Sequence, residues 1–301
     1  MATWNELSTE ISQAIQAVGK NVVTVQAGGG RTSSGIILED NTIVASAHAV
    51  SEAENTRVWT AHDKPHTATL VGRDSGTDIA LFKTDAKLSD SKVVFAENPQ
   101  LAVGQFVVAV ARTWRGNLVA SAGILSGLMG EWHTYRGKKI DAYIRPDLTL
   151  YSGFSGGALI GSDQKIIGMT TGALRRGSPL AVPYATIKRV TPILREKGHI
   201  PNPYLGVGLQ PVRLPESLGQ KLNLTQHAGA LVVHLEPGSP ADRAGLLVGD
   251  ILLSISDGSF GEERAVSILS RLAPGKSASI SGVRGGQSFT SNIQVGERPR
   301  R

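Results

Sequence analysis

Apolar residues repeat with a helical period at the start of the chain. Between residues 3 and 18 they recur at steps of three or four and share one helix face: Trp4, Leu7, Ile11, Ile15 and Val18. Thr3 and Glu6 have the spacing of a capping box, and Gly19 supplies a stop signal. We therefore expect an amphipathic helix, whose apolar face packs either on its own domain or on another subunit.

From residue 21 to about 190, apolar positions come instead in runs of four to six residues separated by turn residues. Examples are the runs 22–25, 35–38, 79–82 and 106–110. Such runs are too short for buried helices and suit strands. The 35 glycines of the chain also fit a fold with many turns. The pattern predicts β-barrels or a sandwich, closed by a helix over 184–196.

A change of pattern marks a domain boundary. Residues 199–203 contain two prolines within three positions, which cannot continue a helix. Beyond them, 204–297 read as a mixed α/β unit with a helix over 262–272. The expected organisation is a helix at 1–19, a β domain at 20–198, a linker at 199–203, a second domain at 204–297 and a basic tail at 298–301.

The amino-acid composition excludes several kinds of functional site. The chain has no cysteine, which excludes disulfides, thiolate metal sites and a cysteine nucleophile. The net charge is +6, but no nucleic-acid motif accompanies the basic residues, so we expect no nucleic-acid partner. No apolar run approaches the ~18 residues of a transmembrane helix. The histidines lack metal-ligand spacing, and we expect no metal and no cofactor.

Three short motifs in the β domain combine into one possible site. His48 ends an apolar strand, Asp78 opens another, and Ser155 lies in a glycine-rich turn before a third. A serine hydroxyl needs a neighbouring base to take its proton, and a buried carboxylate can hold that base in the correct tautomer. Each motif alone is common, and their coincidence on an all-β background predicts a nucleophile, a base and an orienting acid.

The turn around the serine also suits an oxyanion. Glycines at 153, 156 and 157 permit a backbone in which the N–H groups of Gly153 and Ser155 converge. Such preorganised donors stabilise a tetrahedral intermediate.

These residues resemble the HtrA/Deg family of serine proteases, which join a chymotrypsin-like double β-barrel to PDZ domains. The resemblance covers about residues 20–297. It rests on the strand before His48, on Thr77-Asp78-Ile79-Ala80, on Gly153 to Gly157, and on Asp147 eight residues before Ser155. Phe154 departs from the small polar residue usual beside the nucleophile, and such a bulky group could change the loop conformation.

The resemblance implies further site residues. The substrate pocket would be lined by uncharged residues, which favours a small or medium aliphatic side chain before the cut bond: Leu150, Tyr151, Ser152, Thr170, Thr171 and Gly172. The second domain resembles a PDZ domain whose peptide groove combines a carboxylate-binding loop, a strand edge and one helix: Tyr204, Leu205, Gly206, Val207, Ala265, Ile268 and Leu269.

By this resemblance the chain is an ATP-independent endopeptidase of protein quality control. It would degrade unfolded proteins, bind C-terminal peptides at the PDZ domain and form a homotrimer or higher oligomer through its protease domain and Trp4 and Leu7. Two alternatives stay open: a proteolytically idle chaperone or peptide-binding scaffold, and a regulatory protease that cuts one partner.

The compartment depends on where translation starts. The N-terminus shows no signal-peptide pattern. A native Met1 would indicate the cytoplasm, whereas a mature form restarted with Met would belong to the periplasm or cell envelope.

Overall fold

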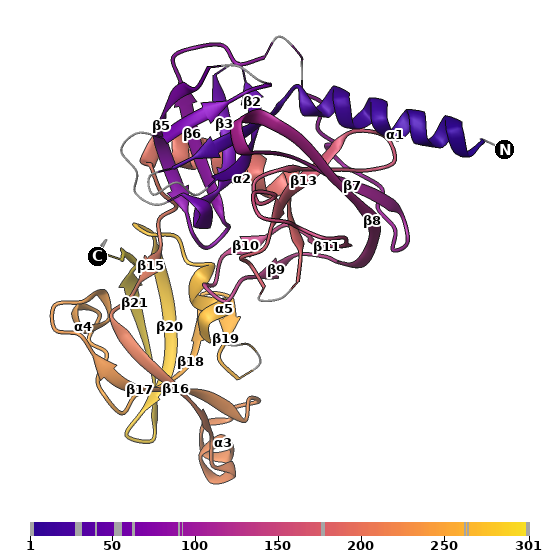
Figure 1. The fold of residues 1–301 in the computed structure, drawn as a ribbon. Helices are drawn as coiled ribbons and strands as arrows, with labels where there is room; N and C mark the ends of the chain where they lie inside the picture. The colour runs from indigo at the N-terminus through magenta and orange to yellow at the C-terminus, as the bar shows by residue number, and fades with distance from the viewer. Residues whose placement is uncertain are drawn as a thin grey trace. The chain divides into compact units, whose positions relative to one another are not determined.

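The computed structural model divides the chain into two compact units, Met1–Ile200 and Pro201–Arg301 (Figure 1). It describes residues 3–27, 32–39, 41–50, 56–61, 64–89, 91, 93–175, 178–261, 263 and 265–298. Residues 1–2, the expected helix start at Glu262 and positions 299–301 of the basic tail lie outside the described residues.

Helix α1, Trp4–Gly19, opens the first unit. Its capping box forms as expected, with Glu6 N–H donating to Thr3 Oγ1 at 3.3 Å and Thr3 N–H to Glu6 Oε2 at 2.6 Å. Gly19 is the last helical residue rather than a stop beyond it. A Cβ there would lie 2.8 Å from Leu118 Cδ1, so glycine permits close packing on the domain. The two ends of the apolar face differ. Its C-terminal part packs on the core, whereas Trp4 near the N-terminus is 86% exposed.

The first β-barrel is antiparallel and closed, in the order β1-β2-β3-β6-β5-β4. Its strands are β1 Val22–Gln26, β2 Thr32–Glu39, β3 Thr42–Ser46, β4 Thr56–Trp59, β5 His66–Asp74 and β6 Ile79–Thr84. A 3-10 turn, η1 Ala47–Ala49, follows β3 and carries His48. Phe82, Ile43 and other apolar side chains fill the barrel interior.

The second barrel is also antiparallel and closed, in the order β11-β14-β13-β12-β7-β8. Its strands are β7 Phe106–Thr113, β8 Asn117–Met129, β11 Tyr143–Asp147, β12 Ala158–Ile160, β13 Ile166–Thr171 and β14 Leu180–Pro183, with a 3-10 turn η2 at Trp114–Gly116. The expectation of antiparallel barrels is confirmed, and the sandwich alternative is not what forms.

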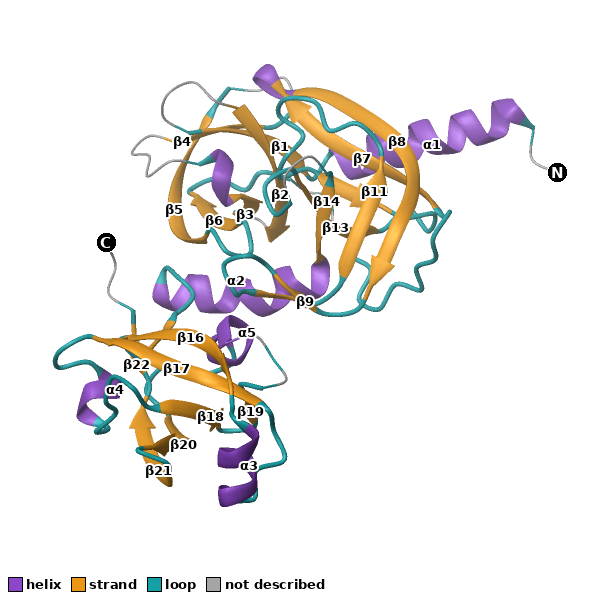
Figure 2. Cartoon of the chain, turned by 90° about the horizontal axis from the view of Figure 1, so that it is seen from below, coloured by secondary structure: helices purple, strands orange, loops and turns teal. Residues whose placement is uncertain are grey.

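Two further elements complete this unit. A small hairpin of β9 Trp132–His133 and β10 Lys139–Ile140 stands between β8 and β11. Helix α2, Tyr184–Lys197, contacts β5 and β6 of the first barrel and β13 and β14 of the second (Figure 2). It ends at Gly198, whose φ of 72° is the left-handed conformation expected of a C-cap. Residues of both barrels and α2 share one apolar cluster, so this core fixes the barrels to each other.

The second unit is a six-stranded antiparallel sheet with short helices. The strand order is β16-β17-β18-β20-β21, with β19 paired to β18, and β15 pairs separately with β22. The strands are β15 Pro203–Tyr204, β16 Val207–Arg213, β17 Ala228–Leu235, β18 Ile251–Ile255, β19 Gly258–Ser259, β20 Ser277–Arg284, β21 Gln287–Gln294 and β22 Gly296–Glu297. The helices are α3 Glu216–Leu222, α4 Pro240–Arg243 and α5 Ala265–Ser270. Strand β16 forms one edge of the sheet.

Among the described helices, none has both the length and the apolar character that a membrane crossing requires.

Candidate functional site

The His48 imidazole lies directly against the Asp78 carboxylate. Its Nδ1 is 2.9 Å from each carboxylate oxygen, and the His48 backbone N–H also donates to Oδ1 at 2.9 Å. The Asp78 side chain is 2% exposed, whereas that of His48 is 40% exposed. The imidazole therefore has one ring nitrogen fixed by a buried acid and the other side open to a reactant.

This hydrogen bond controls the basicity of the ring. The bond to Asp78 raises the pKa of His48 above its usual value, burial opposes the shift, and the negative charge of Asp78 adds to it. A base in this position is held in one tautomer and stabilised once it becomes charged.

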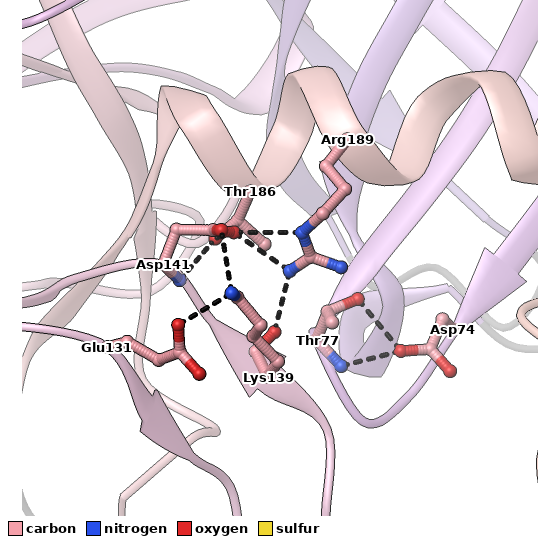
Figure 3. Close-up of polar contacts among 7 residues, drawn as sticks. All are labelled: Asp74, Thr77, Glu131, Lys139, Asp141, Thr186 and Arg189. Carbon is pink, nitrogen blue, oxygen red and sulfur yellow. Dashed lines mark hydrogen bonds and ion pairs between the residues drawn. The ribbon is translucent and has the colours of Figure 1, made fainter. Parts of the chain in front are cut away.

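A tight turn between β5 and β6 presents Asp78. Asp74 at the end of β5 accepts hydrogen bonds from Thr77 N–H at 2.7 Å and Thr77 Oγ1 at 2.8 Å (Figure 3). Asp78 itself has a φ of 60°, which non-glycine residues rarely adopt. The Asp74 cap and the strand pairing of Asp74 with Ile79 hold the backbone in this conformation.

Thr171, at the end of β13, supplies the other contact of the acid. Its hydroxyl donates to Asp78 Oδ2 at 2.6 Å. The sequence analysis placed Thr170 and Thr171 in the substrate pocket, but both side chains are fully buried. The Thr170 hydroxyl instead donates to Phe154 O at 2.6 Å. The two threonine side chains thus support the acid and the serine turn rather than lining a pocket.

The turn that carries Ser155 lies against the first barrel. The Ser155 carbonyl accepts from Ser34 N–H at 2.9 Å. A Cβ on Gly156 would be 1.9 Å from Ser34 O and 3.2 Å from Ser46 N, so only glycine lets the turn approach the strand that leads into His48. The structure therefore brings the Ser155 turn close to the His48 segment, although no hydrogen bond joins the Ser155 hydroxyl to the ring within the part of the chain described.

Phe154 points into the second barrel. Its side chain is 2% exposed and belongs to the apolar cluster that also contains Leu159 and Ile167. The Tyr151 ring packs edge-on against it, with ring centroids 5.7 Å apart. The unusual residue beside the serine is thus an anchor for the turn.

The backbone of the same turn leaves two donors available. Phe154 N–H donates to Tyr151 O at 3.1 Å, and Gly156 N–H to Thr170 O at 2.8 Å. Gly153 has a φ of 90°. Within the described residues, the N–H groups of Gly153 and Ser155 donate to no protein acceptor. A pair of N–H groups that is to bind an anion must be left without a protein acceptor in this way.

The other residues expected to line the substrate pocket lie before this turn or after β13. Tyr151 is 63% exposed, and Ser152 and Gly172 are exposed. Leu150 is half-buried and packs on the core of the second barrel. Their uncharged surfaces are compatible with an apolar substrate side chain.

A polar cluster fixes the β9–β10 hairpin to α2 (Figure 3). Asp141 accepts from Thr186 Oγ1 at 2.7 Å and from the Arg189 guanidinium at 2.8 and 3.1 Å, and Arg189 also donates to Lys139 O at 2.9 Å. Partial burial raises the pKa of Asp141, but the hydrogen bonds from Arg189 and Thr186, together with the positive charges of Arg189 and Lys139, outweigh it and hold that pKa below its usual value.

In the second unit, Tyr204 ends β15, Leu205 and Gly206 form the loop, and Val207 opens the edge strand β16. Gly206 has a φ of 73°, and a Cβ there would be 2.2 Å from Ser239 Cβ. Leu205 is 6% exposed and belongs to the core, while Tyr204 donates from its hydroxyl to Glu236.

Helix α5 ends at Ser270, two residues before the expected end at Leu272. Ile268, assigned to the groove from sequence, is 2% exposed and packs in the core of this unit. Ala265 and Leu269 are half-buried, and Val266, which sequence reasoning missed, is 53% exposed. The exposed apolar surface of this helix therefore differs from the expected one at Ile268.

Family models match both units. Residues 33–169 match the trypsin-like peptidase domain, and residues 231–266 match the PDZ domain. The fold and the two matches define a chymotrypsin-like double barrel joined to a PDZ domain.

Curated relatives point to one family. The chain is 31% identical over 274 residues to a probable periplasmic serine endoprotease, DegP-like, of Rhizobium meliloti, covering 87% of this chain and 52% of the relative. A protein of the same name from Hahella chejuensis is 29% identical over 276 residues, covering 89% and 57%. The chain belongs to the HtrA/Deg family of serine proteases with a PDZ domain, and it spans about half the length of these relatives.

Solved structures share the fold. The HtrA-type protease AlgW with decapeptide has a TM-score of 0.75 at 23% identity, covering 96% of this chain and 99% of the other. A serine endoprotease from Yersinia pestis has a TM-score of 0.75 at 24% identity, covering 96% and 98%.

Proposed function

We propose that this chain is a serine endopeptidase in which Ser155 is the nucleophile, His48 the general base and Asp78 the orienting acid. The observation that carries the proposal is the contact of His48 Nδ1 with both oxygens of the buried Asp78 carboxylate, beside the turn that presents Ser155. The approach of Gly156 to Ser34 and Ser46 supports the assembly of all three groups.

The steps follow from these roles. Ser155 Oγ attacks the peptide carbonyl carbon as His48 Nε2 takes its proton, and the carbonyl oxygen becomes an oxyanion that accepts from Gly153 and Ser155 N–H. His48 then gives the proton to the leaving amine, and the C–N bond breaks to leave an acyl-enzyme. Water, deprotonated by His48, attacks the ester, and Ser155 regains its proton when the acid product leaves.

The substrates we propose are unfolded proteins, cut after small or medium aliphatic residues. The uncharged residues Leu150, Tyr151 and Ser152 support this preference, since a pocket without a charge does not select a basic side chain. The PDZ unit would bind C-terminal peptides along β16, and exposed Trp4 and Leu7 would contact other copies in a trimer or larger oligomer. Because the DegP-like relatives are named periplasmic, the proposal includes that compartment.

Covalent labelling of Ser155 by a fluorophosphonate, beside digestion of an unfolded protein, tests the activity. We expect the wild type to show both signals and Ser155→Ala to show neither. Ser162→Ala is the matched control, because Ser162 is an exposed serine of the second barrel outside the proposed site, and it should retain labelling.

Other outcomes of this experiment would favour the two alternative functions. Absence of labelling and digestion in the wild type, with a C-terminal peptide present, would favour the idle chaperone. The burial of Phe154 argues against that alternative, because its side chain does not occupy the space beside Ser155. Cleavage of one partner without digestion of unfolded protein would favour the regulatory protease.

A further inference from the structure

Ser34 lies on β2 of the first barrel and is fully buried. It follows Ser33, a neighbour of the same type that is also buried, at 2% exposure. Successive strand residues point to opposite faces of a sheet. The Ser33 hydroxyl donates to Val25 O at 3.5 Å within its own barrel, whereas the Ser34 hydroxyl forms its hydrogen bonds with residues of the second barrel.

Two groups of Ser34 bind two residues of the serine turn. The Ser34 hydroxyl lies 2.8 Å from Gly153 O, and the Ser34 N–H donates to Ser155 O at 2.9 Å. These carbonyls belong to Gly153 and Ser155, whose N–H groups form the proposed oxyanion site. Each carbonyl shares its peptide plane with the N–H of the next residue, whereas the N–H of the same residue lies in the preceding peptide. Fixing the carbonyl therefore fixes one of the two peptide planes that meet at the residue and limits how far the other can turn.

The same hydroxyl is itself held in place by β7. It accepts from Arg112 N–H at 3.0 Å and lies 3.1 Å from Arg112 O, so the two acceptors share its single proton and Gly153 O is the nearer. The Arg112 side chain is buried, and its guanidinium donates to the Gly19, Val22 and Gly116 carbonyls. The strand that supports Ser34 is therefore anchored by several buried hydrogen bonds.

We propose that Ser34 is a positioning residue, whose hydroxyl holds the Gly153 carbonyl so that the oxyanion site of the adjoining turn is formed before substrate arrives. The inference rests on the proposed protease function. Ser34 acts across the two barrels: it keeps the Gly153–Phe154 peptide in one orientation, and it does not touch the substrate. Preorganised donors matter mainly in the transition state, so this role predicts an effect on kcat rather than on KM.

Steady-state cleavage of a peptide substrate by Ser34→Ala measures the effects on kcat and on KM separately. We expect kcat to fall on the order of 10- to 100-fold, below the loss on removing an oxyanion donor itself, with KM changed by less than about twofold. The affinity for a peptidyl boronic acid, whose adduct with Ser155 carries a tetrahedral oxyanion, should fall by a factor similar to that of kcat.

Two further variants separate positioning from folding. Ser33→Ala removes a buried hydroxyl from the same strand and should leave kcat within about twofold of wild type. Ser34→Cys retains a weak donor of similar shape, cannot form an intrachain disulfide because the chain has no other cysteine, and should lie between wild type and Ser34→Ala. If Ser34→Ala does not fold, the kcat of Ser34→Cys decides.

The outcomes distinguish the two proposals. No cleavage by the wild type refutes the protease function itself. An active wild type with unchanged kcat and boronic-acid affinity in Ser34→Ala refutes the role of Ser34 alone. Equal losses in Ser33→Ala and Ser34→Ala, or a loss confined to KM, would show a general packing effect and would also overturn the inference.

Discussion

At the scale of single residues, the site depends on how Asp78 is held. Its φ of 60° is unfavourable for an aspartate, and four neighbours compensate for it. Asp74 caps the turn through Thr77, the Thr171 hydroxyl binds Oδ2, and Ala47 N–H donates to Asp78 O at 3.1 Å. The carboxylate consequently faces His48 without needing to reorganise during a reaction.

The pH dependence of cleavage should report this contact. The hydrogen bond to Asp78 raises the pKa of His48, and only neutral imidazole can accept the Ser155 proton. The acid limb of the kcat/KM profile should therefore lie above the usual value for histidine, with activity lost as pH falls through it. NMR titration of the His48 ring should give the same midpoint, and Asp78→Asn should lower it. A midpoint at or below the usual histidine value would contradict the assignment.

At the scale of elements, the serine turn is fastened from both sides. Ser34 of β2 binds its carbonyls from the first barrel, and Phe154 extends into the apolar interior of the second. The sequence analysis made Phe154 a possible cause of a changed conformation in this turn. The burial of Phe154 indicates instead that it stabilises the turn, because a large apolar side chain in a packed core restricts the backbone that carries it.

Truncation of this anchor should affect both stability and activity. Phe154→Ala should lower the free energy of unfolding by about 3–5 kcal/mol, as for other buried phenylalanines, and should slow fluorophosphonate labelling of Ser155. Phe106→Ala is the matched control, because Phe106 is 41% exposed on β7 of the same barrel. Denaturant unfolding and labelling rates would be compared. Similar effects of the two substitutions would contradict the anchoring role.

At the scale of the whole molecule, the chain combines two units with separate cores. The first unit contains the proposed catalytic groups. In the second, β16 is the edge strand of the sheet among the described strands, and it follows the loop around Gly206. A peptide that adds to such an edge gains main-chain hydrogen bonds, and its terminal carboxylate needs the N–H groups of the preceding loop.

Peptide binding to the second unit should depend on Gly206. Gly206→Ala would place a Cβ 2.2 Å from Ser239 Cβ, so we expect at least about a tenfold loss of affinity for a C-terminal peptide. If the PDZ unit regulates cleavage, this peptide should raise turnover in the wild type but not in the variant. Gly238→Ala is the control, because Gly238 also has a positive φ, of 69°, but open space around its Cβ position. Fluorescence anisotropy with free and amidated peptides measures the binding, and equal affinities for both glycine variants would refute the assignment.

The sequence alone determined the features that depend on local pattern. Strand and helix periods identified the two kinds of domain, the capping box located α1, and residue types singled out His48, Asp78 and Ser155. Asp74 could also have been found, because an aspartate three residues before a threonine in a turn is a local signal.

Only the tertiary structure decided which side chains point toward the site and which support it. The sequence analysis placed Ile268 in the peptide groove and Thr171 in the substrate pocket, but packing turns the first into the core and the second toward Asp78. Ser34 gave no local signal, since Gly153 is 119 positions away along the chain. Periodicity along the sequence indicates which face of an element is buried. The hydrogen-bond partner of a buried polar group such as the Ser34 hydroxyl is decided only when the two barrels pack against each other.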